Sequence, residues 1–319
     1  MPFTDNQRGG ERADRLLAVQ VQERPGPPGP YATPDEIPPP VSDPSTGGTR
    51  YGDVEYARVM GYRPLRMDLV LPATASGPVP VVVWIHGGAW LFGSRLYGAV
   101  TEPACRALID RGLAVALVEY RFSGEARFPA CLHDVKAAVR WLHQFGASVG
   151  INPDAIGVWG ESAGGHLAAF IAMNGADERL DGTLGVTGYS SNVVAAVAWY
   201  PATDFLGMGP DRTGWPDPTT PEALLIGGPT RERRQDAAFA SPVSHVHAGA
   251  APILLVHGLQ DDLIPPRQSA LMHEALQAVG ATSELEWIEG AGHSLFGVDP
   301  DPIAERSADF LARHLAPTR

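Results

Sequence analysis

The sequence predicts an α/β fold: a mostly parallel, doubly wound sheet with helices on both faces. Two observations predict it. Short apolar runs rich in β-branched residues alternate with longer stretches of helical periodicity, and the alternation continues from about residue 54 to the C-terminal end of the sequence. The 319 residues suit one large domain or two small ones, and the alternation never breaks for long. We therefore expect a single domain over residues 51–319.

The predicted elements follow in order. Residues 54–60 and 65–71 read as two strands able to pair as an antiparallel ribbon. Residues 79–85 are almost wholly apolar, as in a strand buried on both faces. Residues 130–145 carry apolar side chains at helical spacing. The other elements are expected at 99–110 (helix), 113–118 (strand), 156–159 (strand), 162–173 (helix), 193–200 (strand), 253–256 (strand), 267–279 (helix), 283–288 (strand) and 302–314 (helix).

Two segments interrupt this regularity. Residues 1–50 are expected to form a Pro-rich, irregular N-terminal arm, since nine prolines lie between residues 22 and 50. Residues 204–246 are rich in Gly and Pro, with short helical pieces at 221–226 and 231–238. An insertion after a strand's carboxyl end lies over the place where doubly wound sheets bind ligands. It is therefore expected to form a small lid.

Composition excludes several classes of partner. A formal charge of −12 disfavours nucleic acid and anionic membrane surfaces. No apolar run approaches the roughly 20 residues that span a bilayer, and the N-terminus lacks the apolar core of a signal peptide, so a cytoplasmic location is expected. Cys105 and Cys131 read as free thiols. His245 and His247 stand two apart without acidic neighbours, so no metal site is expected. The oligomeric state stays open between monomer and homodimer.

A serine stands on a cramped corner in the stretch IGVWGESAGGHLAAF. Ser162 lies between a predicted strand and a predicted helix, flanked by Gly160 and Gly164. The pattern G-x-S-x-G in this context is typical of a nucleophile elbow, where glycines permit the sharp turn and the helix N-terminus favours a developing oxyanion. The alternative is a serine that merely caps an ordinary helix.

The stretch VVVWIHGGAW ends a buried strand in backbone with few side chains. Such a loop offers N–H groups to a ligand at close approach. Together with the amide of Ala163, which follows the serine, the amides of Gly88 and Ala89 are the candidates for an oxyanion hole. The alternative for His-Gly-Gly is a simple tight turn.

An acid and a histidine complete a possible triad. Asp261 and Asp262 follow the strand ending at Val256, and His293 lies in a glycine-lined loop after the next strand. Imidazole can take the serine proton, and a buried carboxylate can fix the imidazole tautomer. Either of the two acids could serve until the resemblance given below, which places the acid at Asp261.

Together these stretches resemble the α/β-hydrolase superfamily, and more closely its hormone-sensitive-lipase-like and feruloyl-esterase-like carboxylesterases. The residues that carry the resemblance are His86-Gly87-Gly88-Ala89-Trp90, Gly160-Glu161-Ser162-Ala163-Gly164-Gly165, His257-Gly258-Leu259-Gln260-Asp261 and Gly290-Ala291-Gly292-His293. One departure is Ala89, where many relatives carry a third glycine.

The resemblance implies a serine carboxylesterase for small or aryl esters, with Ser162, His293 and Asp261 as the triad and no cofactor. The alternatives are an aryl-formamidase or small amidase and, in another class, a ligand-binding receptor.

Aromatic residues near the loops of the sheet edge suggest an apolar substrate pocket, with Trp90, Phe205 and Trp215 as candidates. Glu161 is expected to point away from the exposed side of the elbow and to serve structure. His86 is expected to support its own loop, and His166 to pack inside its helix.

Overall fold

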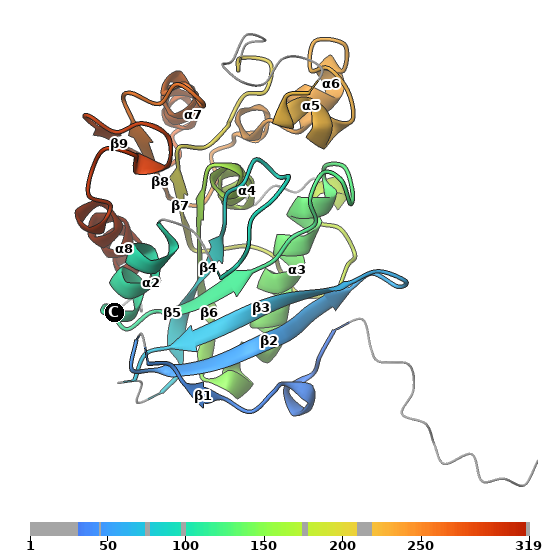
Figure 1. Cartoon of the computed structure of the whole chain (residues 1–319), viewed down its shortest axis with the longest axis vertical. Coiled ribbons are helices and arrows are strands. Elements are labelled where there is room, and N and C mark those ends of the chain that lie inside the picture. The colour runs from blue at the N-terminus through green and yellow to red at the C-terminus, as the bar shows by residue number, and fades with distance from the viewer. Residues whose placement is uncertain are drawn as a thin grey trace, which may run out of the picture.

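The computed structural model describes residues 31–44, 46–73, 77–96, 100–173, 178–208 and 219–316. Over these residues the chain forms one nine-stranded sheet with helices on both faces (Figure 1). The strands are β1 (Val41–Ser42), β2 (Thr49–Arg58), β3 (Pro64–Leu71), β4 (Val79–Ile85), β5 (Ala114–Val118), β6 (Ile151–Glu161), β7 (Ala195–Trp199), β8 (Ile253–Gly258) and β9 (Ser283–Ile288). The α-helices are α2 (Thr101–Ile109), α3 (Ala130–Phe145), α4 (Ala163–Ala172), α5 (Pro221–Ile226), α6 (Arg234–Phe239), α7 (Arg267–Ala278) and α8 (Asp301–Leu315).

The sheet runs in the order β1-β2-β3-β5-β4-β6-β7-β8-β9. β1, β2, β3 and β5 pair antiparallel in succession, and every pair from β5 to β9 is parallel. The predicted ribbon of the first two strands is present, and β4 lies at the centre, fully paired on both sides. The mostly parallel sheet predicted from the sequence is confirmed.

Two apolar cores lie on the two faces of the sheet. Helices α3, α4 and α7 contribute buried residues to one core, and α2 and α8 contribute to the other. In the second core Trp84, Trp159 and Trp199 stand side by side on three adjacent strands, with ring centroids 5.5 and 5.0 Å apart. The indole nitrogen of Trp199 donates to Ser307 Oγ at 2.9 Å, which ties α8 to the sheet.

The parallel strands set up the site because their carboxyl ends meet at one edge of the sheet. The loop after β4 begins at His86, and the corner after β6 holds Ser162. Asp261 follows β8, and His293 follows β9. Four segments far apart in the sequence are thereby brought to the same edge.

The N-terminal boundary differs from the expected one. The described residues of the predicted arm belong to the fold: η1 (Pro34–Glu36) is a 3-10 turn, β1 pairs with the start of β2, and the Trp141 indole donates to the carbonyl of Ala32 at 2.8 Å. Proline content predicts irregular backbone. The local sequence gives no sign of a strand of only two residues, or of a hydrogen bond between a side chain and a distant carbonyl. Strand β6 also begins five residues earlier than predicted, where Ile151 pairs with Val79 across an irregular register.

Deletion of residues 31–44 should therefore lower stability. A chain that begins at residue 45 leaves the buried Trp141 indole without its acceptor and removes the ring of Tyr31 from Phe145. Loss of one buried hydrogen-bond partner costs about 1–3 kcal/mol, so the melting temperature should lie below that of a chain that begins at residue 31. Activity of the folded protein should be retained, because residues 31–44 do not line the pocket described below. Equal melting temperatures would contradict this expectation.

None of the described helices combines the length and the apolar character needed to cross a bilayer.

Candidate active site

The corner at Ser162 is as tight as the glycines around it suggest. Ser162 has φ 54° and ψ −116°, a backbone conformation that costs energy outside glycine. A Cβ on Gly160 would lie 2.1 Å from the carbonyl oxygen of Gly164, and one on Gly164 would lie 2.0 Å from that of Ile85. Ser162 occupies the N-cap position of α4, yet its hydroxyl makes no capping hydrogen bond. Instead the hydroxyl points out toward a histidine.

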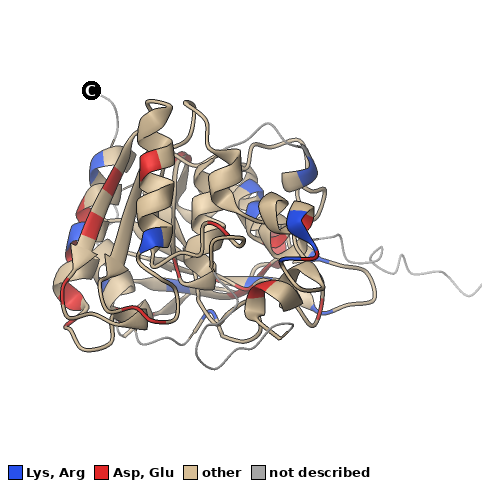
Figure 2. Cartoon of the chain, turned by 90° about the horizontal axis from the view of Figure 1, so that it is seen from above, with Lys and Arg blue, Asp and Glu red and all other residues tan. Residues whose placement is uncertain are grey.

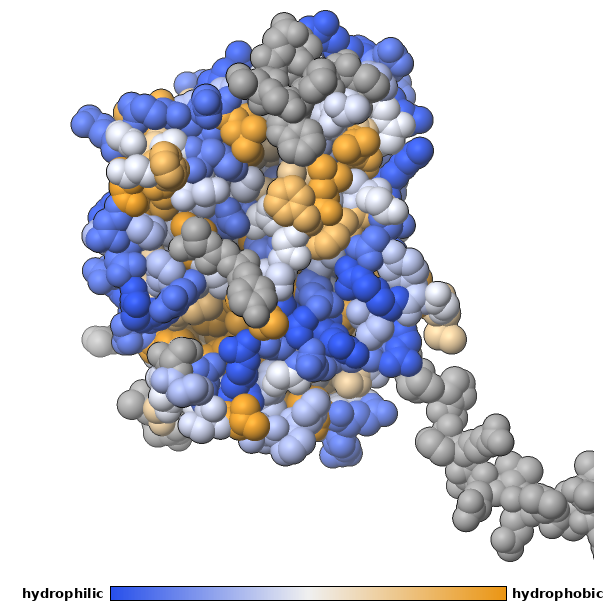
Figure 3. All heavy atoms as spheres, in the orientation of Figure 1, coloured by the Kyte–Doolittle hydropathy of each residue, from blue (hydrophilic) through white to orange (hydrophobic). Residues whose placement is uncertain are grey.

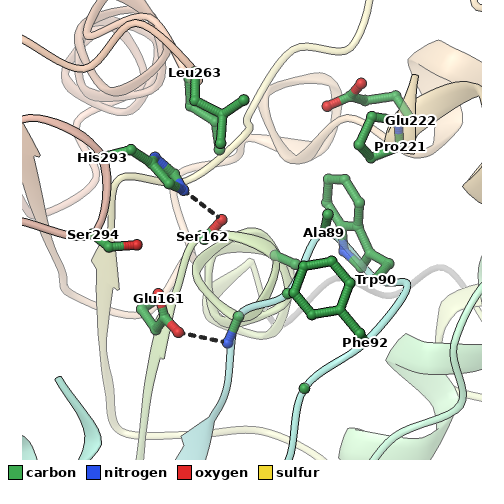
Figure 4. Close-up of a pocket in the computed structure, with 15 residues that line it drawn as sticks. Ala89, Trp90, Phe92, Glu161, Ser162, Pro221, Glu222, Leu263, His293 and Ser294 are labelled. Atoms are coloured by element: carbon green, nitrogen blue, oxygen red, sulfur yellow. Dashed lines mark hydrogen bonds between the residues drawn. The ribbon is translucent and has the colours of Figure 1, made fainter. Parts of the chain in front are cut away.

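Three side chains form a continuous hydrogen-bonded line. Ser162 Oγ lies 3.0 Å from His293 Nε2 (Figure 4). On the other side of the same imidazole, Nδ1 lies 2.8 Å from Asp261 Oδ2. The three predicted triad residues are therefore brought together, while Asp262 is exposed. The line allows a proton to leave the serine while a carboxylate holds the imidazole.

Asp261 is held by more than the histidine. Its Oδ1 accepts the backbone amides of Leu263 at 3.0 Å and Ile264 at 2.8 Å. Burial by itself raises the pKa of this carboxyl, but hydrogen bonds from His257 and His293 and from the Ile264 amide outweigh burial and hold the pKa well below its usual range. Asp261 is therefore ionised throughout the neutral and mildly acidic range.

His257 was named only among the residues that carry the family resemblance, without a role of its own. It is fully buried at the end of β8, with Nδ1 2.7 Å from Ser269 Oγ and Nε2 2.9 Å from the carbonyl of Ile264. Since a carbonyl only accepts, Nε2 carries the proton. The same nitrogen lies 3.4 Å from Asp261 Oδ2. His257 thus supports the loop that carries the acid.

The loop after β4 has a strained backbone at the residues whose amides are the candidates for the oxyanion hole. Gly88 has φ 114°, and a Cβ there would lie 1.9 Å from the carbonyl oxygen of Phe92. Ala89 and Trp90 also have positive φ, at 55° and 56°. Among the bonds of the described residues, the amides of Gly88 and Ala89 donate to no protein acceptor. Ala163 begins α4, where an amide has no partner within the helix.

Glu161 holds the start of this loop. Its Oε1 accepts the amide of Gly87 at 2.8 Å (Figure 4), and its Oε2 accepts the hydroxyl of Tyr200 at 3.1 Å. Burial raises the pKa of Glu161, while these two bonds oppose the rise. The expectation that Glu161 serves structure fits this geometry. The expectation that it points away is wrong, because it lines the pocket.

Two further contacts fix the loop from behind. The Trp90 indole donates to His166 Nδ1 at 3.2 Å, and His166 Nε2 lies 2.9 Å from the carbonyl of Ala240. Burial lowers the pKa of His166 to about 3, so the ring is neutral and can accept and donate at once. His86 supports its own loop as expected, with Nδ1 2.6 Å from the Gly87 carbonyl.

The outer end of the loop is anchored by charge. Arg95 pairs with Asp53, Glu119 and the buried Asp68, whose Oδ1 lies 3.1 Å from Arg95 Nε. Asp68 also pairs with Arg50 at 2.6 Å. Elsewhere on the described surface basic and acidic residues are interspersed (Figure 2).

The line of three residues opens into a pocket of about 440 Å³. It is lined by Gly87, Gly88, Ala89, Trp90, Phe92, Gly93, Glu161, Ser162, Ala163, Pro221, Glu222, Leu263, Ile264, His293 and Ser294. Pro221 and Glu222 come from α5, so a described part of the predicted lid borders the pocket. Figure 3 shows an apolar surface in the region between α4 and α5.

The three aromatic candidates for substrate contact have different outcomes. Contact of Trp90 with a substrate stays a prediction, and Trp90 lines the pocket. Phe205 does not: it is buried against Trp90 and His166, with ring centroids 5.4 and 5.1 Å away, so it supports the pocket wall from behind. The prediction of substrate contact by Phe205 is therefore corrected. Trp215 lies outside the described residues.

Residues 67–276 match the BD-FAE family model, which is most of the chain. The chain belongs to the BD-FAE family. Proteins named as esterases or ester hydrolases resemble the chain in sequence and in structure, as three comparisons illustrate.

The probable carboxylic ester hydrolase LipM of Mycobacterium tuberculosis is 32% identical over 67% of this chain and 48% of its own. A truncated carbohydrate esterase from gut microbiota superposes with a TM-score of 0.75 at 27% identity, covering 86% of this chain and 98% of its own. Esterase 2 of Thermogutta terrifontis, phosphoramylated by tabun, gives a TM-score of 0.66 at 27% identity, covering 83% of this chain and 96% of its own. The matches span about half the length of the curated relatives. The α/β-hydrolase fold implied by the sequence is confirmed.

Proposed function

We propose that this BD-FAE family chain is a serine carboxylesterase that hydrolyses small or aryl carboxylic esters through an acyl-enzyme. The observation that carries the proposal is the hydrogen-bonded line from Ser162 Oγ through His293 to Asp261, with distances of 3.0 and 2.8 Å. The line lies at the mouth of a largely apolar pocket, beside amides that have no protein acceptor among the described residues.

In the first half-reaction Ser162 Oγ attacks the ester carbonyl as His293 Nε2 takes its proton. The carbonyl oxygen becomes an oxyanion, which the amides of Gly88, Ala89 and Ala163 stabilise. Ionised Asp261 stabilises the imidazolium. The tetrahedral intermediate then collapses, His293 gives its proton to the leaving alcohol, and the acyl group stays on Ser162.

In the second half-reaction His293 takes a proton from water, and the resulting hydroxide equivalent attacks the acyl carbon. The same amides stabilise the second oxyanion, and the acid leaves as Ser162 regains its proton. Both steps use only this chain's residues and water, so the proposal requires no cofactor. Its partner is a small-molecule ester.

The names of similar proteins support this proposal. LipM is named a probable carboxylic ester hydrolase, and the Thermogutta enzyme is an esterase modified by an organophosphate. Organophosphates of this kind react with activated serines, and the geometry around Ser162 is the geometry of an activated serine.

A substrate panel tests the reaction class. With para-nitrophenyl acetate, para-nitrophenyl butyrate and N-formylkynurenine, we expect kcat/KM for at least one of the two esters to exceed that for the formamide by at least about tenfold, since an ester has the better leaving group. A preference for N-formylkynurenine would assign the chain to the aryl-formamidases instead. Binding of these esters without turnover would favour a receptor.

A further inference from the structure

A buried tyrosine lies behind the pocket and is hydrogen-bonded in two directions. Tyr200 directly follows β7, is fully buried, and is not among the described residues that line the pocket. Its hydroxyl donates to Glu161 Oε2 at 3.1 Å, and the oxygen of that hydroxyl accepts a hydrogen bond from Ser294. Burial raises the pKa of the Tyr200 hydroxyl well above its usual range, so Tyr200 keeps its proton and can donate it.

Each of these two hydrogen bonds leads to one part of the proposed machinery. The other oxygen of Glu161 accepts the amide of Gly87 at 2.8 Å, in the loop that carries the candidate oxyanion-hole amides (Figure 4). Ser294 directly follows His293, and the ring of Tyr200 packs edge-on against the His293 imidazole with ring centroids 5.0 Å apart. A hydrogen-bonded bridge therefore runs from the histidine loop through Tyr200 to the loop of the amides.

The backbone at both ends of this bridge depends on close contacts. Ser294 has φ 59° and ψ 26°, a conformation that is uncommon outside glycine. At the other end, a Cβ on Gly87 would lie 2.5 Å from Glu161 Oε1. The elbow is tied to the same strand end as Tyr200, because the amide of Ser162 donates to the carbonyl of Trp199 at 2.9 Å. Such backbone persists only where the surrounding structure holds it.

We propose that Tyr200 is a positioning residue that holds His293 and the candidate oxyanion-hole amides at a fixed separation across Ser162. The inference rests on the proposed esterase function and adds to it a residue that does not touch the substrate. A misplacement of about 1 Å can cost roughly 100-fold in rate. Both half-reactions use the same imidazole and the same amides, while the pocket wall that binds the ester lies elsewhere. Loss of the bridge should therefore lower kcat and leave KM nearly unchanged.

The variant Tyr200→Phe tests the bridge, because it removes only the hydroxyl and keeps the ring against His293. With para-nitrophenyl acetate we expect kcat to fall by at least about tenfold and KM to stay within about threefold. A trifluoromethyl ketone forms a tetrahedral oxyanion on an activated serine, so its inhibition constant should rise by at least about tenfold as well. An unchanged kcat, or a loss confined to KM, would overturn the inference.

The matched control is Tyr56→Phe. Tyr56 is also fully buried, and its hydroxyl donates to the backbone carbonyl of Glu119, away from the pocket. Both variants should lower the melting temperature, because each leaves a buried group without its partner. Only Tyr200→Phe should lower kcat, and Tyr56→Phe should stay within about twofold of the unmodified protein. Equal losses of kcat in the two variants would mean that general loosening of the fold, not the bridge, is the cause.

The opposite end of the bridge gives a second test. Ser294→Ala removes an exposed hydroxyl and should also lower kcat. Since both changes break the same bridge, Tyr200→Phe should cost less in the Ser294→Ala background than in the unmodified protein. Fully additive losses would show that the two hydroxyls act separately and would overturn the inference. Should Tyr200→Phe fail to fold, Ser294→Ala alone decides, and an unchanged kcat in that variant rejects the bridge.

The two levels of proposal fail differently. If the unmodified protein hydrolyses no ester, the esterase function itself is wrong. If it hydrolyses esters and Tyr200→Phe, shown to be folded by thermal unfolding, keeps the original kcat, only the role of Tyr200 is wrong.

Discussion

Ser162→Ala should lower kcat for a para-nitrophenyl ester by on the order of 10⁶, the loss measured when the serine of a serine protease is removed. In the proposed mechanism the hydroxyl oxygen of Ser162 is the atom that attacks, and no other described hydroxyl is hydrogen-bonded to His293. Catalysis of roughly 10³-fold over water should remain, because the amides of Gly88, Ala89 and Ala163 still stabilise an oxyanion formed by water. Steady-state kinetics, with a reaction that contains no enzyme as the control, measure the loss of kcat.

The loss must be separated from misfolding and from a different nucleophile. Ser162 has one side-chain partner among the described residues, so the free energy of unfolding should change by no more than about 1 kcal/mol. A fluorophosphonate should label the unmodified protein at Ser162 and leave Ser162→Ala unlabelled. Ser294→Ala, which removes the other serine hydroxyl of the pocket, should still be labelled. Label on Ser294, or activity that survives in Ser162→Ala, would refute the mechanism.

Asp261→Asn should lower kcat by about 10⁴, the size of the loss when a serine protease holds its histidine in the wrong tautomer. The structure gives a local reason. The amides of Leu263 and Ile264 both donate to Oδ1, so an asparagine keeps its oxygen there and turns its NH₂ toward His293. His293 Nδ1 must then accept, the proton moves to Nε2, and that nitrogen can no longer take the proton of Ser162.

The neighbouring acid provides the matched control. Asp262 is exposed and has no hydrogen bond to His293. Because Asp262→Asn changes only the surface, its kcat should stay within about tenfold of that of the unmodified protein. The opposite ranking in folded proteins would refute the choice of Asp261. Because the pKa of Asp261 lies well below its usual range, loss of activity as pH falls from neutral to mildly acidic values should not arise from protonation of this carboxyl.

The sequence predicts best what depends on strand ends. Ser162, Asp261 and His293 each follow a predicted strand, and the edge of a parallel sheet gathers such positions whatever the loops do. The choice of Asp261 over Asp262 rested on the spacing at which the resembling esterases place their acid, and the geometry agrees. Phe205 marks the limit of such predictions. Whether an aromatic side chain faces the substrate or lies behind Trp90 depends on how two loops pack against each other, and no periodic pattern in the sequence encodes that packing.

Contacts between distant segments explain the remaining differences. Glu161 was expected to point away from the exposed side of the elbow, but the Gly87 amide and the Tyr200 hydroxyl hold it inward. The carbonyl of Ala32 meets Trp141 more than a hundred residues later. In each case the sequence around one residue gives no sign of the distant residue that contacts it.

The loop from Asp261 to Ile264 has a consequence for how this protein can change. Its side chains at Leu263 and Ile264 shape the pocket, while the amides of the same two residues hold the triad carboxylate. A substitution there that shifts the backbone alters substrate preference and turnover together. Pro221, on α5, lines the same pocket with no bond to the triad among those of the described residues. Evolution or engineering can therefore retune the pocket from the α5 side at constant turnover, whereas exploration from the β8 side is constrained by pleiotropy.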